Sequence, residues 1–370
     1  MIYFDSGATT LQKPPEVFDA VQRAMRTCAS VGRGGHRAAM EAARQVFECR
    51  MRAARLFDAE PEQVVFTFNA THGLNIAIRS LVAPGDPVAV SGFEHNAVMR
   101  PLRALGAEIR KAGTRLFDPA DTLETFEKVL RTGPRAAVCT HCSNVFGYIL
   151  PVEEITGLCR TYGVPLIIDA SQSAGVLPLS LRKSGAAFIA MPGHKGLYGP
   201  QGTGILLCAE GGSPLLQGGT GSNSESLEMP EFLPDRLEAG THNVWGIAGL
   251  SAGLRFVERR TPEGILAHEQ HLRRLLEKEL RCIPGFRLYA GEPQSGVLSF
   301  TAEGLDCEEI AARLGRRGMA VRAGLHCAPA AHESAGTLKT GTVRVSFSAF
   351  NTPAEVSAFA AECKKLRVNS

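Results

Sequence analysis

The sequence has 370 residues, 44% of them hydrophobic, and a formal net charge of only +3. A chain of this length can bury a large core and is expected to form two domains. The small net charge gives no reason to expect a nucleic acid or a membrane surface as a partner. The N-terminus lacks a basic leader followed by an apolar stretch, and no apolar run approaches about 18 residues. Neither secretion nor membrane insertion is therefore predicted.

The ten cysteines are scattered along the chain. An apolar chain of this size needs no disulfide framework, so free thiols in a reducing cytoplasm are the expectation. Cys139 and Cys142 have a spacing that also occurs in redox and metal sites. No second pair lies at a zinc-site distance, and the segment has the pattern of a strand end. We predict no metal there.

Helical and strand patterns alternate over the first 250 residues, as in an α/β domain. Helical spacing predicts helices over 16–26, 39–57 and 152–162, with another beginning near Leu74. Apolar, β-rich runs predict strands over 64–68, 87–91, 136–141, 164–169 and 188–191. Residues 211–240 are expected to form a long loop. Two helices over 246–260 and 262–281 then lead to strands near 297–301, 320–322 and 343–348, which indicates a smaller α+β domain.

Polar residues follow several of the predicted strands. Thr71 lies where a strand turns through small residues into a helix, and the free N–H groups of such a helix start suit a phosphate. His95 follows the next strand, although it could equally be a capping or surface residue. Asp169 ends a strongly apolar strand, so its carboxylate is expected to be partly desolvated and to prefer a cationic partner.

Lys195 follows the strand over 188–191 and enters a glycine-rich loop that ends at Gly204. Glycines there would let a phosphate or a ring approach the backbone closely. A lone loop lysine is usually solvated. Together with Asp169, however, Lys195 supplies the two groups that pyridoxal 5′-phosphate (PLP) needs most: an amine for a Schiff base and a carboxylate for the pyridine nitrogen.

The smaller domain holds one cysteine in a distinctive setting. Cys327 follows His326 near a predicted strand end, and both His326 and Arg322 could favour its thiolate. A buried, inert cysteine is the common alternative. Arg344 alternates out of an apolar strand, where it could form a domain-edge ion pair or hold the α-carboxylate of an amino acid.

These residues resemble the class V aminotransferase family, and within it the cysteine desulfurases and selenocysteine lyases. The resemblance spans nearly the whole chain and is most specific at 169–172, 193–204 and 322–329. It implies a fold-type-I PLP-dependent transferase with a mostly parallel, seven-stranded-type sheet in the large domain. The implied parts are an N-terminal segment (1–14) packing with the small domain, a large PLP-binding domain (15–250), and a small α+β domain (251–370) carrying the catalytic cysteine loop.

The resemblance also implies roles around the cofactor. Lys195 would form the Schiff base and carry protons, and His95 would stack on the ring and assist proton transfer. The remaining cofactor-binding residues would be Thr71, Asn144, Asp169, Gln172, His194 and Thr241. In the family, the threonine matching Thr241 reaches the phosphate of the neighbouring subunit, which implies a homodimer. Pro192 stands where the family usually has a hydroxyl, so weaker PLP retention is expected unless Thr203 or a water replaces it.

The implied activity is conversion of L-cysteine to L-alanine, with a persulfide on Cys327 passed to an acceptor such as a sulfur-acceptor protein. Arg344, Asn144 and Arg322 would bind the substrate. Three alternatives stay open at this stage: a selenocysteine lyase, a class V transaminase or C–S lyase in which Cys327 is a bystander, and a PLP-binding scaffold without turnover. A comparatively short loop between Cys327 and Arg344 favours a dedicated sulfur acceptor.

Overall fold

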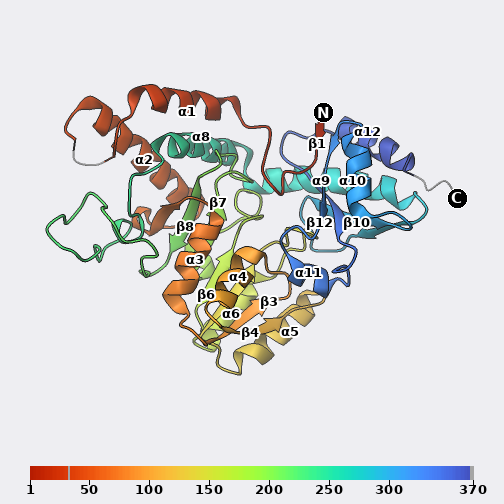
Figure 1. Ribbon diagram of the computed structural model, residues 1–370, viewed down its shortest axis with the longest axis horizontal. Coiled ribbons are helices and arrows are strands. Elements are labelled where there is room, and N and C mark those ends of the chain that lie inside the picture. Colours follow the sequence, from red (N-terminus) through yellow and green to blue (C-terminus); the bar gives the residue numbers. More distant parts are fainter. Residues whose placement is uncertain (32–33, 367–370) are drawn as a thin grey trace.

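A seven-stranded sheet forms the centre of the computed structural model, which describes residues 1–31 and 34–366 (Figure 1). Its strand order is β2-β8-β7-β6-β5-β3-β4, and only β8 runs antiparallel to its neighbours. The strands are β2 (Val64–Thr67), β3 (Pro87–Ser91), β4 (Glu108–Ala112), β5 (Ala136–Thr140), β6 (Leu166–Asp169), β7 (Phe188–Pro192) and β8 (Gly204–Cys208). The mostly parallel α/β fold predicted from the sequence is confirmed.

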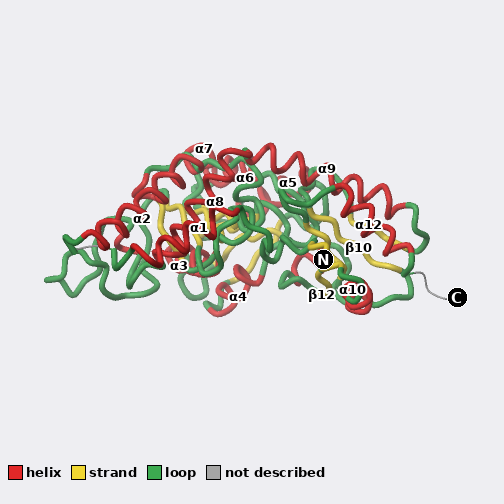
Figure 2. Tube along the Cα trace, turned by 90° about the horizontal axis from the view of Figure 1, so that it is seen from above, coloured by secondary structure: helices red, strands yellow, loops and turns green. Residues whose placement is uncertain are grey.

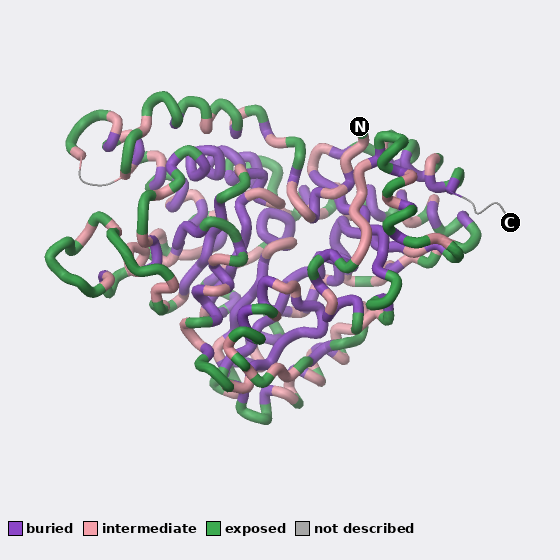
Figure 3. Tube along the Cα trace, viewed as in Figure 1, coloured by how far each residue is buried: buried purple, intermediate pink, exposed green. Residues whose placement is uncertain are grey.

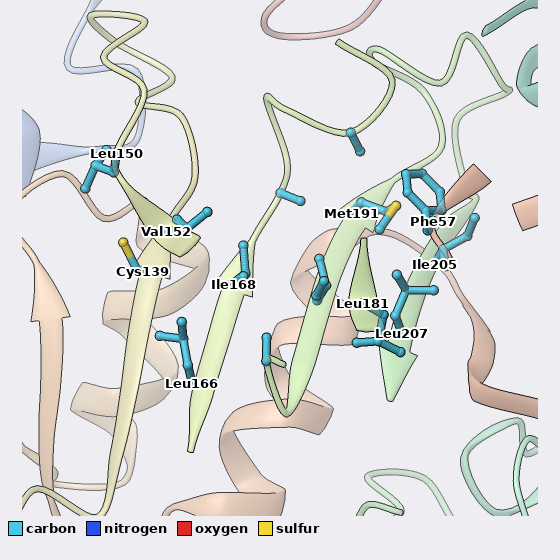
Figure 4. Packing of buried hydrophobic residues seen from close by; sticks show 14 of the residues in the cluster. Phe57, Cys139, Leu150, Val152, Leu166, Ile168, Leu181, Met191, Ile205 and Leu207 are labelled. Carbon is cyan, nitrogen blue, oxygen red and sulfur yellow. The ribbon is translucent and has the colours of Figure 1, made fainter. Parts of the chain in front are cut away.

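The strands of this sheet are buried (purple in Figure 3) except for the edge strand β4, which explains why the others are almost continuously apolar. Successive side chains point to opposite faces, so Leu166 and Ile168 join one core cluster and Ile167 joins another. Figure 4 shows the first cluster, in which Met191 and Ile205 come from the adjacent strands β7 and β8.

Helices cover the two faces unequally (Figure 2). One face packs against α3 (Ala70–Leu81) and α4 (Asn96–Ala104). The other packs against a larger set: α2 (Arg37–Leu56), α5 (Pro119–Leu130), α6 (Val152–Thr161), α7 (Leu181–Ser184) and α8 (Val244–Arg260). The first helix, α1 (Pro15–Thr27), lies against α8, and two short 3₁₀ turns are η1 (Pro61–Gln63) and η2 (Asp235–Leu237).

A second core lies in the C-terminal part. Its antiparallel sheet has the order β12-β13-β10-β9, formed by β9 (Phe286–Tyr289), β10 (Val297–Ala302), β12 (Arg322–Gly324) and β13 (Thr342–Ser346). Three helices pack against it: α9 (Pro262–Arg281), α10 (Cys307–Gly315) and α12 (Pro353–Lys364). The short helix α11 (Pro329–Ser334) instead contributes Ala331 to the first core cluster. The N-terminus joins the second core, because β1 (Ile2–Tyr3) pairs with β11 (Met319–Ala320) and the buried Phe4 stacks edge-on against Phe347 and Phe359.

One predicted strand is wrong in detail. The run over 320–322 is not a single strand: β11 pairs with β1, whereas β12 pairs with β13, and Val321 lies between them. The predicted domain limits remain a prediction, and α8 continues without a break through residue 250. None of the helices over 1–31 and 34–366 is long and apolar enough to cross a bilayer.

Candidate active site

Five strands of the large sheet bring candidate residues to one edge. Because β2, β3, β5, β6 and β7 run in one direction, the polar residues that follow them gather at the carboxyl ends of the strands. A cavity of about 500 Å³, including its open mouth, lies there. Seven predicted cofactor residues line it together: Thr71, His95, Asn144, Asp169, Gln172, His194 and Lys195.

Lys195 is shielded from water and is influenced by the positive charge of Arg344. Burial is the main reason that the pKa of its ammonium falls from 10.5 to about 8, and the guanidinium of Arg344 lowers it further. The opposing negative charge of Asp169 offsets only part of this shift. The amine is therefore available as a neutral nucleophile far nearer to neutral pH than an exposed lysine would be.

Two buried carboxyl groups lie under the cavity. Asp169 is 2% exposed, and only its Oδ1 accepts hydrogen bonds from the N–H and hydroxyl of Ser171. Glu94, which sequence reasoning missed, accepts the N–H of Thr140 at 2.7 Å and also bonds Ser91. Burial, more than the charge of Asp169, raises the pKa of Glu94 to about 8. Its position after a buried strand is the same signal that identified Asp169.

His95 and His194 are both held neutral. Nδ1 of His95 accepts the N–H of Ala97 at 3.0 Å, which leaves Nε2 to carry the proton. Burial is the main cause that lowers the pKa of each ring to about 4. His194 also contacts the N-terminal segment, because its Nδ1 lies 3.0 Å from Oγ1 of Thr9.

The start of α3 is suited to an anion. Asn69 caps the N–H of His72 at 2.9 Å, while the N–H groups of Ala70 and Thr71 belong to the first turn and have no intrahelical acceptor. Pro192 lines the same cavity and offers neither a hydroxyl nor an N–H. Thr203 does not replace it, since its hydroxyl donates to the carbonyl of Pro200 at 2.7 Å and it lines a different cavity.

The glycines around Lys195 serve chain packing, which corrects the expectation that they make room for a ligand. A β-carbon on Gly193 would lie 2.1 Å from Oγ1 of Thr203, and one on Gly196 would lie 2.4 Å from the carbonyl of Ala174. Neither position can take a side chain. The loop is therefore fixed tightly against its neighbours, and this fixes the place of Lys195.

Arg344 is buried at the junction of the two cores. Its Nη2 bonds Oδ1 of Asp5 at 2.6 Å and its Nη1 bonds the carbonyl of Asn144 at 2.9 Å, while Nε has no hydrogen-bond partner among the described residues. Arg322 lies directly opposite on β12. Burial lowers the pKa of Arg344, but the adjacent Asp5 opposes that shift and keeps the pair ionic. Asp5 was missed because a carboxylate near a chain start carries no sequence signal.

Cys327 is exposed, on a turn that is joined to the cavity-lining Asn144 through the carbonyl of His326. The carbonyl of Cys327 accepts the N–H of Asn96, next to His95, at 2.8 Å. His326 and Cys327 have φ values of 49° and 56°, which cost residues with a β-carbon on the order of 1–3 kcal/mol each. The expectation that His326 favours the thiolate by its charge is wrong, because burial lowers the pKa of this ring to about 2 and keeps it neutral.

Buried neutral histidines predict acid-labile folding. His141 and His326 are 8% and 4% exposed, and burial lowers their pKa values to about 4 and about 2. The unfolded chain binds protons below pH 6.5 and the folded chain does not, so their stabilising contribution is complete above pH 6.5 and is lost as the pH falls. Each should remove about 1.4 kcal/mol of unfolding free energy per pH unit between 6.5 and 4.

Urea unfolding between pH 7.5 and 5 measures this slope. His326→Gln should reduce it, whereas His271→Gln, at an exposed position on α9, should leave it unchanged. Equal slopes for His326→Gln and the unaltered protein would contradict the assignment.

Thr241 stands apart from the other predicted residues. It is exposed and lines a second cavity with Phe68 and His72, not the one that holds Lys195. Cys139 and Cys142 are both buried, and among the described residues no three His, Cys, Asp or Glu side chains are grouped to hold a metal ion.

Comparison with known proteins decides the family. The model of the aminotransferase class-V family matches residues 2–359. The chain belongs to this family. A probable cysteine desulfurase of Methanothermobacter thermautotrophicus is 33% identical over 372 residues, which cover 96% of this chain and 92% of that protein. The apo structure of a cysteine desulfurase from Thermococcus onnurineus NA1 superposes with a TM-score of 0.92 at 32% identity, covering 99% of this chain and 94% of that one.

Class V aminotransferases depend on PLP, so the cofactor predicted from the sequence is confirmed at the level of the family. The cavity fits that cofactor. It combines an amine of lowered pKa on Lys195, a buried carboxylate on Asp169, a helix start free to bind a phosphate, and the neutral ring of His95.

Proposed function

We propose that this protein is a PLP-dependent cysteine desulfurase that converts L-cysteine to L-alanine and retains the sulfur as a persulfide on Cys327. The observation that carries the proposal is the 2.8 Å hydrogen bond from the N–H of Asn96 to the carbonyl of Cys327. It fastens the turn that carries this exposed thiol to the residue after His95, and His95 lines the same cavity as Lys195. An ordinary transaminase has no need of a thiol at that place.

Each of the proposed cofactor-binding residues would contact a different part of PLP. Bound PLP supplies an electron sink that stabilises negative charge on the substrate carbon. Asp169 would pair with its ring nitrogen, while Asn144 and Gln172 would bond its phenolic oxygen. Thr71, His194 and the free N–H groups at the start of α3 would hold the phosphate. Lys195 would bind the cofactor covalently between turnovers.

Proton transfer falls to Lys195 and His95. The lowered pKa of Lys195 lets its neutral amine accept the proton from the substrate's α-carbon and return it later. His95 presents Nε2 as its proton-bearing atom, because Nδ1 is occupied by the N–H of Ala97. Nε2 is therefore the atom through which His95 would pass a proton to the substrate and recover one.

The sulfur step uses Cys327 as the nucleophile. Its thiolate attacks the sulfur of the substrate, a sulfur–sulfur bond forms, and the bond between that sulfur and the β-carbon breaks. The electron pair stays with the substrate, whose β-carbon takes up a proton to become the methyl group of alanine. Two thiol protons are thus redistributed between the persulfide and alanine, and no external oxidant is needed. An acceptor thiol then removes the persulfide sulfur.

Substrate recognition would depend on Arg344. Its buried guanidinium bonds Asp5 and the carbonyl of Asn144 and still has an unpartnered Nε, so it can take a carboxylate in addition. Arg322, opposite on β12, adds positive charge for the same group.

The active form would be a homodimer in which Thr241 completes the neighbouring site. Its position outside the Lys195 cavity supports this, and so does the exposure of the apolar Phe68, which lines the same second cavity as Thr241. The sulfur-acceptor protein and the cytoplasmic location remain predictions.

Product analysis tests the proposed function. Purified protein with PLP, L-cysteine and a reductant should release alanine and sulfide in equal amounts. Pyruvate and ammonia in place of alanine would indicate a C–S lyase. Transfer of the amino group to a keto acid, with no alanine formed, would indicate a transaminase. A reaction with PLP but without the protein measures the non-enzymatic background. If the protein gives no product above this background, the chain only binds PLP and has no activity toward L-cysteine.

A further inference from the structure

A continuous chain of hydrogen bonds links Arg344 to the Cys327 turn. Arg344 Nη1 donates to the backbone carbonyl of Asn144 at 2.9 Å, and Nδ2 of the same Asn144 donates to the carbonyl of His326 at 2.8 Å. All three residues are at least nine-tenths buried. One residue therefore contacts both the guanidinium proposed to hold the substrate and the turn that carries the nucleophile.

The turn itself has a conformation that its sequence disfavours. The N–H of Ala328 bonds the carbonyl of Leu325 at 2.9 Å, and both residues between them have positive φ, as type I′ turns require. Such turns favour Asn-Gly, because a β-carbon is strained in the left-handed region. His326 and Cys327 both carry one, so their surroundings must hold them in place.

Three groups from different elements hold the turn. Nδ2 of Asn144 bonds the His326 carbonyl, the N–H of Asn96 bonds the Cys327 carbonyl, and Nε2 of His326 lies 3.1 Å from the carbonyl of Thr342. The Thr342 contact comes from β13, which pairs with the strand β12 that leads into the turn. Of the two from the large sheet's side, only that of Asn144 comes from a side chain and is open to substitution.

We propose that Asn144 is a positioning residue for the nucleophile: it fixes the strained Cys327 turn at one distance from Arg344. The role of this positioning in catalysis rests on the proposed function, in which Cys327 is the nucleophile. The hydrogen-bond clamp itself is made by residues of this chain alone. Asn144 would thus serve the cysteine turn in addition to its expected contact with the cofactor, since its amide nitrogen has two hydrogens and the turn uses one.

Hydrogen–deuterium exchange in the PLP-loaded protein, with no L-cysteine added, tests the clamp without any turnover. In Asn144→Ala, the amides of Ala328 and Asn96 should exchange about tenfold faster, because the strained turn loses a buried hydrogen bond. Asn351→Ala is the matched control: Asn351 is also buried and donates Nδ2 to a backbone carbonyl, that of Tyr3 at 3.1 Å. It should leave both amides protected.

A rescue variant distinguishes release of the strained Cys327 turn from a general loosening of the fold. Adding Cys327→Gly to Asn144→Ala should restore the protection of the Ala328 amide, because glycine relaxes the second position of the turn. Unchanged exchange in Asn144→Ala, equal acceleration in Asn351→Ala, or no rescue by glycine would each overturn the proposal. A desulfurase assay that fails while the exchange pattern is as expected would overturn the proposed function and leave the clamp standing.

Discussion

Cys327→Ala is expected to abolish alanine and sulfide formation from L-cysteine, by at least about a thousandfold, while leaving PLP bound. The thiolate is the only group proposed to take the substrate's sulfur, and its loss leaves the carbon–sulfur bond without an attacking nucleophile. The cofactor residues lie on other elements of the large sheet, so their cavity should not change. Alanine and sulfide are quantified together, with the absorbance of bound PLP as the check on cofactor content.

Cys282→Ala is the matched control, because Cys282 is also exposed and free but lies after α9, outside the site. It should retain full activity. If Cys327→Ala retains activity as well, the persulfide mechanism fails and the bystander role of this cysteine, in a lyase or a transaminase, becomes the correct interpretation.

Much of the fold was accessible from the sequence because strong local patterns coincide with burial. The strands that carry the site, such as β6 and β7, are apolar without interruption and are buried on both faces, so a short apolar run was a sufficient signal. Strand β8 was missed because it directly follows the glycine-rich loop. Strand β4 was missed because Glu108, Arg110 and Lys111 make it polar at the sheet edge.

The sequence allowed the individual site residues to be predicted, but not the contacts between residues of different elements. His95, Asp169 and Lys195 each follow a buried parallel strand, and parallel strands place such residues at a common edge. The partners of Arg344 were not predictable, because Asp5 and Asn144 are separated from it by 339 and 200 residues. The neutral state of His326 was equally hidden, since it depends on tertiary burial and not on its neighbours in sequence.

Lys195→Ala should remove both covalent retention of PLP and turnover, the latter by at least about a thousandfold. The chain offers a rival amine, which makes the experiment informative: burial also lowers the pKa of Lys13 to about 8, and its Nζ donates to the carbonyl of His194 at 3.1 Å. Borohydride reduction followed by peptide mapping identifies which lysine carries the cofactor. In the unaltered protein the label should lie on the peptide that contains Lys195.

Lys13→Ala is the control for this assignment and should keep both the label and the activity, because Lys13 does not line the cavity that holds Asp169 and His95. Recovery of the label on Lys13, or covalent PLP persisting in Lys195→Ala, would contradict the assignment. The physical distinction between the two amines is their surroundings. Lys13 bonds a hydroxyl and a carbonyl that fix it in place. Lys195 instead lines the cavity together with Asp169, whose negative charge raises the pKa of the Lys195 ammonium. Lys195 therefore lies where the proposed cofactor would bind, and Lys13 does not.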